Sequence, residues 1–337
     1  MNKIILNKDS VIYVLCPAYF KTGGTELLHQ YVYVAKKNGL KATIVYPNAT
    51  NEKNINPAFL CYINEYKNLP DILDEKQNVL IVPEIYTNYL KKYKMIKKVI
   101  WWESVDNYCK LVSYKFALKL GLYKQILYIF KNKHKMLLPK QLKSIDYHFV
   151  QSEYARDYIE QKKCNNIFYV SDYINEIYLN SQIDLSMKED IVCYNPKKGY
   201  DFTRRIISSS TTKIRFIPIE NMTNDEVRDL LKRSKVYIDF GNHPGKDRFP
   251  REAAMMKCCI ITGKNGSAKY YEDVAIPDEY KFDNKKSNIK AIKLKIVECI
   301  NNYNSKINDF NYYVDKTIKE KEQFENNVID CYELENE

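Results

Sequence analysis

The chain has 337 residues, which is more than a single hydrophobic core usually serves, so we expect two domains. Hydrophobic residues make up 45% of the chain, as in a globular protein, and no run of about eighteen apolar residues is present to span a bilayer. The 53 basic and 42 acidic side chains leave a net charge of +11, which favours an acidic partner: a nucleotide, a phospholipid surface or nucleic acid.

The cysteines and histidines predict neither a disulfide framework nor a metal site. The nine cysteines are an odd number, are scattered and include no C-x-x-C pair. The four histidines show no metal-ligand spacing, so no metal is predicted. Charges at Lys3, Lys8 and Asp9 interrupt the N-terminal apolar residues where a signal peptide would have its apolar core, and we expect a cytoplasmic protein.

The first predicted elements form a βαβ unit of the doubly wound α/β type. Residues 11–16 have the pattern of a strand, residues 25–38 that of a helix and residues 42–46 that of a second strand. Gly23 and Gly24, just before the helix, permit a tight turn with close backbone approach to a ligand. Two glycines of this kind are also common in an ordinary turn.

An acidic, aromatic segment follows the predicted strand at residues 98–101. The stretch W-W-E-S-V-D-N, residues 101–107, places Glu103 and Asp106 beside aromatic side chains, which suits a sugar with its apolar ring face and its hydroxyls. The alternative is that the tryptophans are core residues and that Ser104 or Asp106 caps a helix. Both interpretations are open from the sequence.

Residues 107–145 contain nine lysines and no aspartate or glutamate, with many apolar residues between the lysines. A basic, apolar and helical segment is typical of a contact with an anionic membrane surface. An ordinary pair of helices packed on the domain explains the same pattern. We favour the membrane interpretation and expect a peripheral location on the inner face of the plasma membrane.

The remaining elements alternate between strands and helices, as in a second doubly wound unit. Polar, turn-rich residues 171–188 are expected to connect the two halves. The turn N-P-K-K-G at residues 195–199 carries Lys197 and Lys198 directly after a strand. Further strands are predicted at residues 78–82, 146–150, 166–170, 191–194 and 213–218, and further helices at 153–160, 223–234, 289–300 and 307–318.

The segment V-Y-I-D-F to C-C-I-I-T, residues 236–262, predicts a strand, a polar loop, a helix and a second strand. Pro250 is expected at the first helical position, which places Glu252 in the first turn. Three cations surround this helix start and oppose its dipole, so an anion such as a diphosphate is expected there. Asp247 and Glu252 are the internal alternative to such a ligand. The three cations are Lys246, Arg248 and Arg251.

The pattern G-K-D-R-F-P-R-E-A-A at residues 245–254, with G-S-A at residues 266–268 and G-G-T-E at residues 23–26, resembles bacterial GT-B glycosyltransferases related to the family-four group. Enzymes of that group build cell-surface polysaccharides. The resemblance implies an α/β fold of two Rossmann-like doubly wound domains that face each other across a cleft. The group has a second glutamate eight positions before the one matched by Glu252, and here that position is Pro244.

The resemblance also implies roles for individual residues. Glu252 would hold the ribose of a nucleotide-sugar donor, and Glu103, Asp106 and Asp247 are the catalytic candidates. The group binds the donor with its glycine loop and its basic loops, and the diphosphate leaves without help from a metal. The donor-binding candidates are therefore Gly23, Gly24, Lys197, Lys198, Lys246, Arg248, Arg251 and Glu252.

The expected molecule has an acceptor-side domain at residues 1–178, with residues 107–145 as its basic helical insert. A donor-binding domain follows at residues 186–310, and residues 311–337 form a helix that returns to the first domain. We expect a glycosyltransferase that uses a nucleotide-diphosphate sugar, with no cofactor, and a glycan or lipid-linked acceptor. The alternative is a non-catalytic binding or scaffold protein of the same fold, which Pro244 favours. Nucleic acid is not expected as a partner, because no recognised binding module accompanies the charge.

Overall fold

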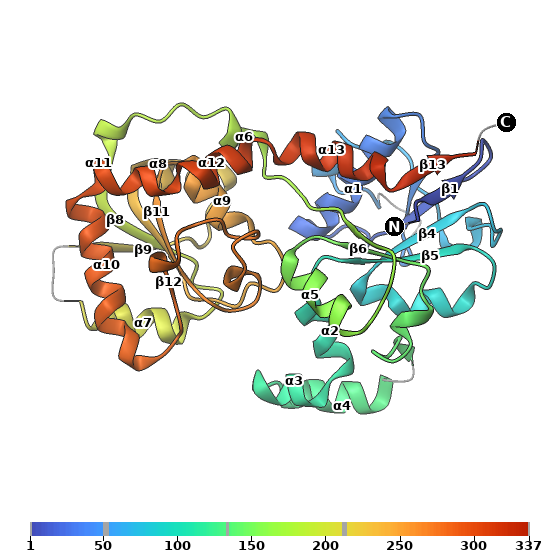
Figure 1. The fold of residues 1–337 in the computed structure, drawn as a ribbon, viewed down its shortest axis with the longest axis horizontal. Coiled ribbons are helices and arrows are strands. Elements are labelled where there is room, and N and C mark those ends of the chain that lie inside the picture. The colour runs from blue at the N-terminus through green and yellow to red at the C-terminus, as the bar shows by residue number, and fades with distance from the viewer. Residues whose placement is uncertain (1, 50–53, 133–134, 211–213, 336–337) are drawn as a thin grey trace. The chain divides into compact units, whose positions relative to one another are not determined.

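The computed structural model describes residues 2–49, 54–132, 135–210 and 214–335. The chain divides into two compact units. In Figure 1 the first is coloured blue to green, with its last segment in red, and the second is coloured yellow-green to orange-red. The first unit consists of Met1–Asp172 and Glu322–Glu337, and the second of Tyr173–Lys321. Each unit is built around a sheet of parallel strands.

The first unit has a six-stranded sheet in the order β3-β2-β4-β5-β6-β7. All neighbouring strands are parallel, and β2, β3 and β4 are buried along their whole length, as expected for a sheet covered on both faces. The order reverses between β2 and β4, which makes their carboxyl ends the topological switch point of this sheet. The strands are β2 (Ile12–Leu15), β3 (Ala42–Val45), β4 (Val79–Pro83), β5 (Lys97–Trp102), β6 (Tyr147–Val150) and β7 (Ile167–Tyr169).

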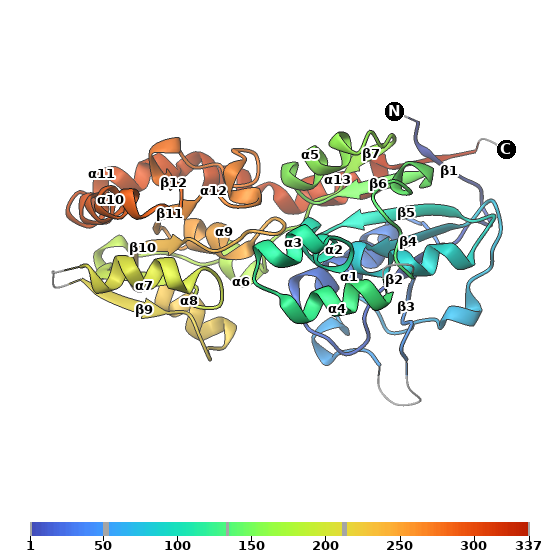
Figure 2. The same ribbon diagram turned by 90° about the horizontal axis from the view of Figure 1, so that it is seen from below.

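Helices cover both faces of this sheet, with α1 and α13 on one side and α2 and α5 on the other (Figure 1). Thr22 caps α1 through a capping box with Thr25, so the helix begins at Gly23, two residues before the predicted start. Helices α3 and α4 pack side by side as a short hairpin (Figure 2). The helices are α1 (Gly23–Lys37), α2 (Val105–Val112), α3 (Tyr114–Lys119), α4 (Tyr123–Asn132), α5 (Glu153–Gln161) and α13 (Glu320–Asp330), whose first two residues belong to the second unit.

Two short strands near the chain ends form a separate sheet in the first unit. Strand β1 (Ile4–Leu6) pairs in parallel with β13 (Tyr332–Leu334), with Ile4 opposite Tyr332. The Tyr332 hydroxyl forms a hydrogen bond with the hydroxyl of Tyr31 in α1. The last part of the chain is therefore built into the first unit.

The second unit has a five-stranded parallel sheet in the order β12-β11-β10-β8-β9, which reverses between β8 and β10. Helices α7 and α10 contact each other on one face, and α9 contacts α12 on the other. The strands are β8 (Glu189–Tyr194), β9 (Arg215–Pro218), β10 (Ser234–Asp239), β11 (Cys259–Gly263) and β12 (Lys281–Phe282). The helices are α6 (Glu176–Leu179), α7 (Tyr200–Ser208), α8 (Asn224–Arg233), α9 (Arg248–Met255), α10 (Ile289–Asn301), α11 (Tyr303–Lys306) and α12 (Asn311–Ile318).

The structure confirms the strand, loop, helix and strand order predicted for residues 236–262, but it corrects the start of the helix. Helix α9 begins at Arg248, so Pro250 is its third residue instead of its first, and Glu252 lies in the second turn. The first four N–H groups of a helix have no partner within the helix, so proline is tolerated at the third position as well. Asp247 precedes the helix in an extended conformation.

Candidate functional site

Two loops of the second unit meet at the carboxyl ends of β8 and β10, the place where open α/β sheets bind ligands. Gly199, before α7, has a φ of +63°, and a Cβ there would lie 2.3 Å from the carbonyl oxygen of Phe240. A Cβ on Gly241 would lie 2.4 Å from the Cβ of Lys198. Only glycine fits at either position, and this close packing brings Lys198 against the loop after β10.

Four ionisable side chains form an array between these loops, in which a lysine and a histidine alternate with two aspartates. The Lys198 ammonium lies 2.8 Å from both carboxylate oxygens of Asp247. On the other side of Asp247, its Oδ2 lies 3.4 Å from Nδ1 of His243, and the Nε2 of His243 lies 3.5 Å from Oδ1 of Asp239. The array runs from Asp239 at the end of β10 to Lys198 before α7.

Asp239 anchors the buried end of this array. Its Oδ2 accepts a hydrogen bond of 2.9 Å from the Tyr237 hydroxyl, and its Oδ1 accepts one of 2.8 Å from the N–H of Gly241. Burial favours the protonated acid, but the His243 ring and these two hydrogen bonds outweigh it and lower the pKa of Asp239. Asp239 is therefore ionised at neutral pH.

Among the described residues, Asp239, His243 and Asp247 are a group that offers metal-ligand atoms within 4.8 Å of one another. Their surroundings suit a proton better than a metal ion. The Lys198 ammonium already binds both oxygens of Asp247, and Tyr237 and Gly241 already bind the two oxygens of Asp239. A divalent cation would have to displace these donors and would meet the charge of Lys198.

A second cluster holds the base of the same loop. Glu320, 3% exposed, lies 2.7 Å from the Lys246 ammonium and 2.7 Å from a guanidinium nitrogen of Arg251. The same guanidinium donates to the carbonyl oxygens of Lys246 at 3.0 Å and Asp247 at 3.4 Å. Arg251 is completely buried. This geometry favours a bracing role for Lys246 and Arg251 over the diphosphate contact predicted for them from the sequence.

The G-S-A segment supports the loop from the next strand end. The backbone N–H of Ser267 donates to the carbonyl oxygen of His243 at 2.8 Å. The Ser267 hydroxyl donates to the carbonyl oxygen of Gly245 at 2.6 Å. A Cβ on Gly266 would lie 2.0 Å from the same His243 oxygen. Residues 266–268 therefore fix the backbone of the loop that carries His243.

The remaining donor-side candidates differ in exposure. Lys197 is exposed, and its backbone N–H donates to the Asn195 side chain at 3.0 Å. Arg248 is half-buried at the first position of α9. Glu252 is buried. The pKa of Tyr178 in α6 is raised mainly by the burial of Tyr178 and next by the nearby carboxylate of Glu252. Of the two adjacent lysines, the structure brings only Lys198 into the charged array.

In the first unit, Gly24 and Glu103 come together at the switch point. A Cβ on Gly24 would lie 2.0 Å from Oε2 of Glu103, so the carboxylate occupies the N-terminal end of α1. The N–H of Glu103 donates to Oε2 of Glu84 at 3.1 Å. Glu84 directly follows β4 and is buried, and burial raises its pKa to about 7.

In residues 101–107 the tryptophans are core residues and Ser104 caps a helix, which is the second of the two interpretations that the sequence left open. Trp101 and Trp102 are fully buried, and the hydroxyl of Ser104 caps α2 by accepting from the N–H of Asn107. Asp106 is 1% exposed and accepts a hydrogen bond of 2.7 Å from Tyr154. Asp106 therefore has almost no surface to offer a substrate, whereas Glu103 is half-buried.

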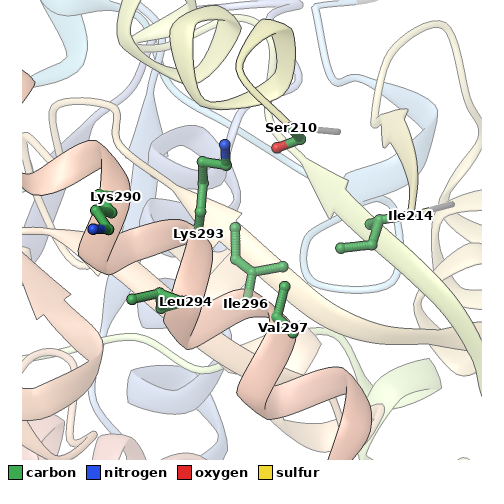
Figure 3. Close-up of a pocket in the computed structure, with 7 residues that line it drawn as sticks. All are labelled: Ser210, Ile214, Lys290, Lys293, Leu294, Ile296 and Val297. Carbon is green, nitrogen blue, oxygen red and sulfur yellow. The ribbon is translucent and has the colours of Figure 1, made fainter. Parts of the chain in front are cut away.

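Figure 3 shows a cavity of about 200 Å³ in the second unit, where Lys293 of α10 points toward Ser210. Ile214, in its lining, lies just before β9, so the cavity is at the amino ends of the strands. Parallel sheets bind their ligands at the opposite edge. The cavity therefore takes no part in the candidate site.

Sequence reasoning missed four carboxylate and imidazole groups: Glu84, Asp239, His243 and Glu320. A local signal existed for Glu84 and Asp239, because each lies at the carboxyl end of a predicted parallel strand. For His243 and Glu320 there was no such signal. Glu320 reaches Arg251 from 69 residues away along the chain.

Comparisons with solved structures identify the fold of the chain, whereas sequence comparisons find no match. Neither a protein-family model nor a curated protein sequence matches the chain. Among solved structures it is similar to TarM, with a TM-score of 0.63 and 12% identity over 96% of this chain and 99% of that chain. Sucrose-phosphate synthase from Thermosynechococcus elongatus is similar with a TM-score of 0.61 and 10% identity, over 96% of this chain and 100% of the other. An alpha-glucosyltransferase in complex with UDP and a 13-mer DNA has a TM-score of 0.55 and 10% identity, over 95% and 99%.

Sequence identities of 10–12% show the fold and nothing finer. The likeness covers nearly the whole chain, and both sheets described above are parallel with one reversal of strand order. The chain therefore has the GT-B fold of these glycosyltransferases, with two Rossmann-like units, as the sequence predicts.

Proposed function

We propose that the protein is a glycosyltransferase that moves a sugar from a nucleotide-diphosphate donor to a glycan or lipid-linked acceptor, in cell-surface polysaccharide synthesis. The observation that carries the proposal is the meeting of two basic loops at the β8/β10 switch point, with Lys198 held 2.8 Å from Asp247. The fold supports it, because similar solved structures include a glucosyltransferase in complex with UDP.

The chemistry required of this site is stabilisation of a departing nucleoside diphosphate. Helices α7 and α9 begin in the loops that follow β8 and β10, and the positive end of a helix dipole favours an anionic group. Lys198 and Arg248 add full positive charges where negative charge develops on the leaving group. Glu252 is the proposed partner of the ribose. No cofactor is part of the proposal.

The test separates two adjacent lysines. Lys198→Met should weaken UDP binding at least about tenfold, which corresponds to about 1.4 kcal/mol, because it removes a charge from the switch point. The matched control is Lys197→Met, which removes the same charge from an exposed neighbour and should change the Kd less than about twofold. Isothermal titration calorimetry measures both. Equal effects of the two substitutions would contradict the proposed site.

The second candidate is a non-catalytic GT-B binding or scaffold protein. Pro244, at the position of the expected glutamate, is the observation that favours it. Transfer or hydrolysis from any of the uridine, guanosine, thymidine or cytidine diphosphate sugars excludes this candidate. UDP binding with no turnover of any of these donors supports it.

We also propose that the protein lies peripherally on the inner face of the plasma membrane and contacts anionic lipid through α3 and α4. None of the described helices is long and apolar enough to cross a bilayer. Tyr123, Leu127 and Phe130 share one face of α4, and Leu127 and Phe130 are 74% and 81% exposed. Lys124 and Lys131 lie along one side of that face, and no acidic residue occurs in residues 107–145. Apolar side chains bordered by lysines suit the boundary between anionic headgroups and acyl chains.

A further inference from the structure

His243 is a completely buried ring held between two carboxylates. Its Nε2 lies 3.5 Å from Asp239 and its Nδ1 lies 3.4 Å from Asp247. Neither nitrogen has a partner that satisfies ordinary hydrogen-bond geometry. The two carboxylates are therefore the groups that determine which protonation state of the ring fits.

A neutral imidazole has one N–H and one lone pair. In this position the lone pair would face a carboxylate across about 3.5 Å, and the buried group would carry an uncompensated negative charge. An imidazolium offers one N–H to each carboxylate instead. With Lys198, the array then contains two negative and two positive charges and is balanced.

An anionic donor changes this balance. To bind a diphosphate, the Lys198 ammonium must turn from Asp247 toward the ligand, which leaves the Asp247 carboxylate close to further negative charge. Asp247 is 19% exposed, so water compensates it only partly. A positive His243 behind Asp247 is the one charge in this array that remains to compensate it.

We infer that His243 is a positioning residue that couples donor binding to its own protonation: the imidazolium holds Asp247 in place while Lys198 leaves it for the diphosphate. This inference rests on the proposed function, because it assigns Lys198 to the donor. His243 does not touch the donor in this proposal. It acts through Asp247.

The groups around the ring fix the direction of the pH dependence. Burial favours the neutral ring, but Asp239 and Asp247 outweigh it and raise the pKa of His243 above its ordinary value, while Lys198 opposes them. The segment that packs on the His243 backbone, Gly266 and Ser267, has no ionisable side chain. Donor affinity is therefore expected to be high below the raised pKa and to fall as the pH rises through it.

The experiment measures the Kd of UDP and of inorganic pyrophosphate from pH 7 to pH 9.5 by calorimetry. Both ligands also lose a proton within this range, so the wild type is compared with His243→Gln at each pH. At pH 7 the wild type should bind at least about tenfold more tightly than His243→Gln, and this difference should disappear by pH 9.5. Asp247→Asn removes the charge that must be compensated and should bind tightly at every pH.

Nuclear magnetic resonance of the imidazole nitrogens tests the ring itself without a donor and without a substitution that threatens folding. His243 should give an imidazolium signal at pH 7. His29 and His148 are internal controls, because burial lowers the pKa of each to about 4 and both should be neutral. His134→Gln identifies the signal of His134, and the remaining signal then belongs to His243.

The outcomes separate the inference from the proposed function. A His243 ring that is neutral at pH 7, or a His243→Gln protein that keeps the wild-type pH dependence, overturns the inference and leaves the proposed donor site standing. A wild type that binds neither UDP nor pyrophosphate at any pH overturns the proposed donor site, and the inference with it. An imidazolium at pH 7, together with an affinity difference between wild type and His243→Gln that disappears by pH 9.5, supports both.

Discussion

Glu84 is the buried carboxyl group whose environment has the clearest consequence at the residue scale. It is 3% exposed directly after β4, and burial raises its pKa to about 7. A carboxyl group with that pKa exchanges a proton near neutral pH, as general acids and bases do. It also accepts the N–H of Glu103, the residue whose carboxylate lies at the start of α1.

The raised pKa of Glu84 has a sign that stability measurements can test. Between pH 4.5 and 7 the folded protein binds a proton at Glu84 that the unfolded chain has released, so stability falls as the pH rises through this window. Glu84→Gln abolishes that proton uptake. Its free energy of unfolding, relative to wild type, should therefore rise by roughly 2–3 kcal/mol between pH 4.5 and pH 8.

Urea unfolding at several pH values makes this measurement. Glu322→Gln is the control, because Glu322 is exposed in the same unit, and its difference from wild type should stay within about 0.5 kcal/mol. A Glu84→Gln difference that does not change with pH would mean that Glu84 is ionised throughout.

The sequence indicated which loops carry the candidate site but not which of their side chains act together. Lys197 and Lys198 are equivalent in the sequence, and only a contact with Asp247, 49 residues later, separates them. His243 has no local signal at all, because its environment consists of one carboxylate four residues before it and one four residues after it, brought around the ring by a loop. Such contacts depend on loop geometry, which residue patterns do not encode.

At the scale of elements, the start of α13 holds the loop before α9. Glu320 neutralises Lys246 and Arg251, and all three groups are almost completely buried. A buried ion cluster contributes little net stability, but removing one partner leaves uncompensated charge. Glu320 is therefore a counter-ion that both buried cations share.

Glu320→Ala should destabilise the protein by about 3 kcal/mol, because two buried cations lose a carboxylate that lies 2.7 Å from each of them. Glu322→Ala, two residues further along α13 and exposed, should cost no more than about 0.5 kcal/mol. Denaturant unfolding measures both. A small loss for Glu320→Ala would mean that water replaces the carboxylate, against the burial described here.

The start of α1 and the end of β5 should be coupled through Gly24 and Glu103. Alanine at position 24 favours the helix by about 0.5–1 kcal/mol but displaces the Glu103 carboxylate, whose interaction with the helix end is of similar size. Gly24→Ala should therefore be near neutral in the wild type and stabilising by about 0.5–1 kcal/mol in a Glu103→Ala protein. A double-mutant cycle measures the coupling, and additive effects would rule it out.

Strands with strong local patterns were predictable, and strands defined by distant partners were not. Residues 42–46 and 236–240 were predicted from β-branched and aromatic runs, and β3 and β10 confirm them within two residues. Strands β1 and β13 have three residues each and pair with each other from opposite parts of the chain, so neither has a local signal. The start of α9 was also not predictable from the local pattern, because the helix begins at Arg248, directly after the extended residue Asp247.

At the scale of the whole molecule, we propose that the net charge of +11 favours binding to an anionic lipid surface. Leu127→Glu with Phe130→Glu places two acidic groups on the apolar face of α4. We expect this variant to lose at least about tenfold in binding to phosphatidylserine vesicles, because it removes apolar contact and adds repulsion. Vesicle sedimentation at moderate salt measures the binding.

Leu294→Glu is the matched control, an exposed leucine on α10 of the second unit, and it should bind vesicles as the wild type does. Binding to neutral and anionic vesicles alike would contradict the charge argument. Binding to duplex DNA but not to vesicles would favour nucleic acid as the acidic partner.

The pairing of β1 with β13 has a consequence for how the chain acquires its fold during translation. The second unit is one continuous segment, Tyr173–Lys321, so all of its residues are synthesised before Glu322–Glu337. The first unit, although its sheet is synthesised earlier, has to wait for β13 and for Phe324 and Val328, which are fully buried. The N-terminal half is therefore expected to mature last, with β1 exposed as an open edge for most of synthesis, which makes this unit the one that depends on protection by chaperones.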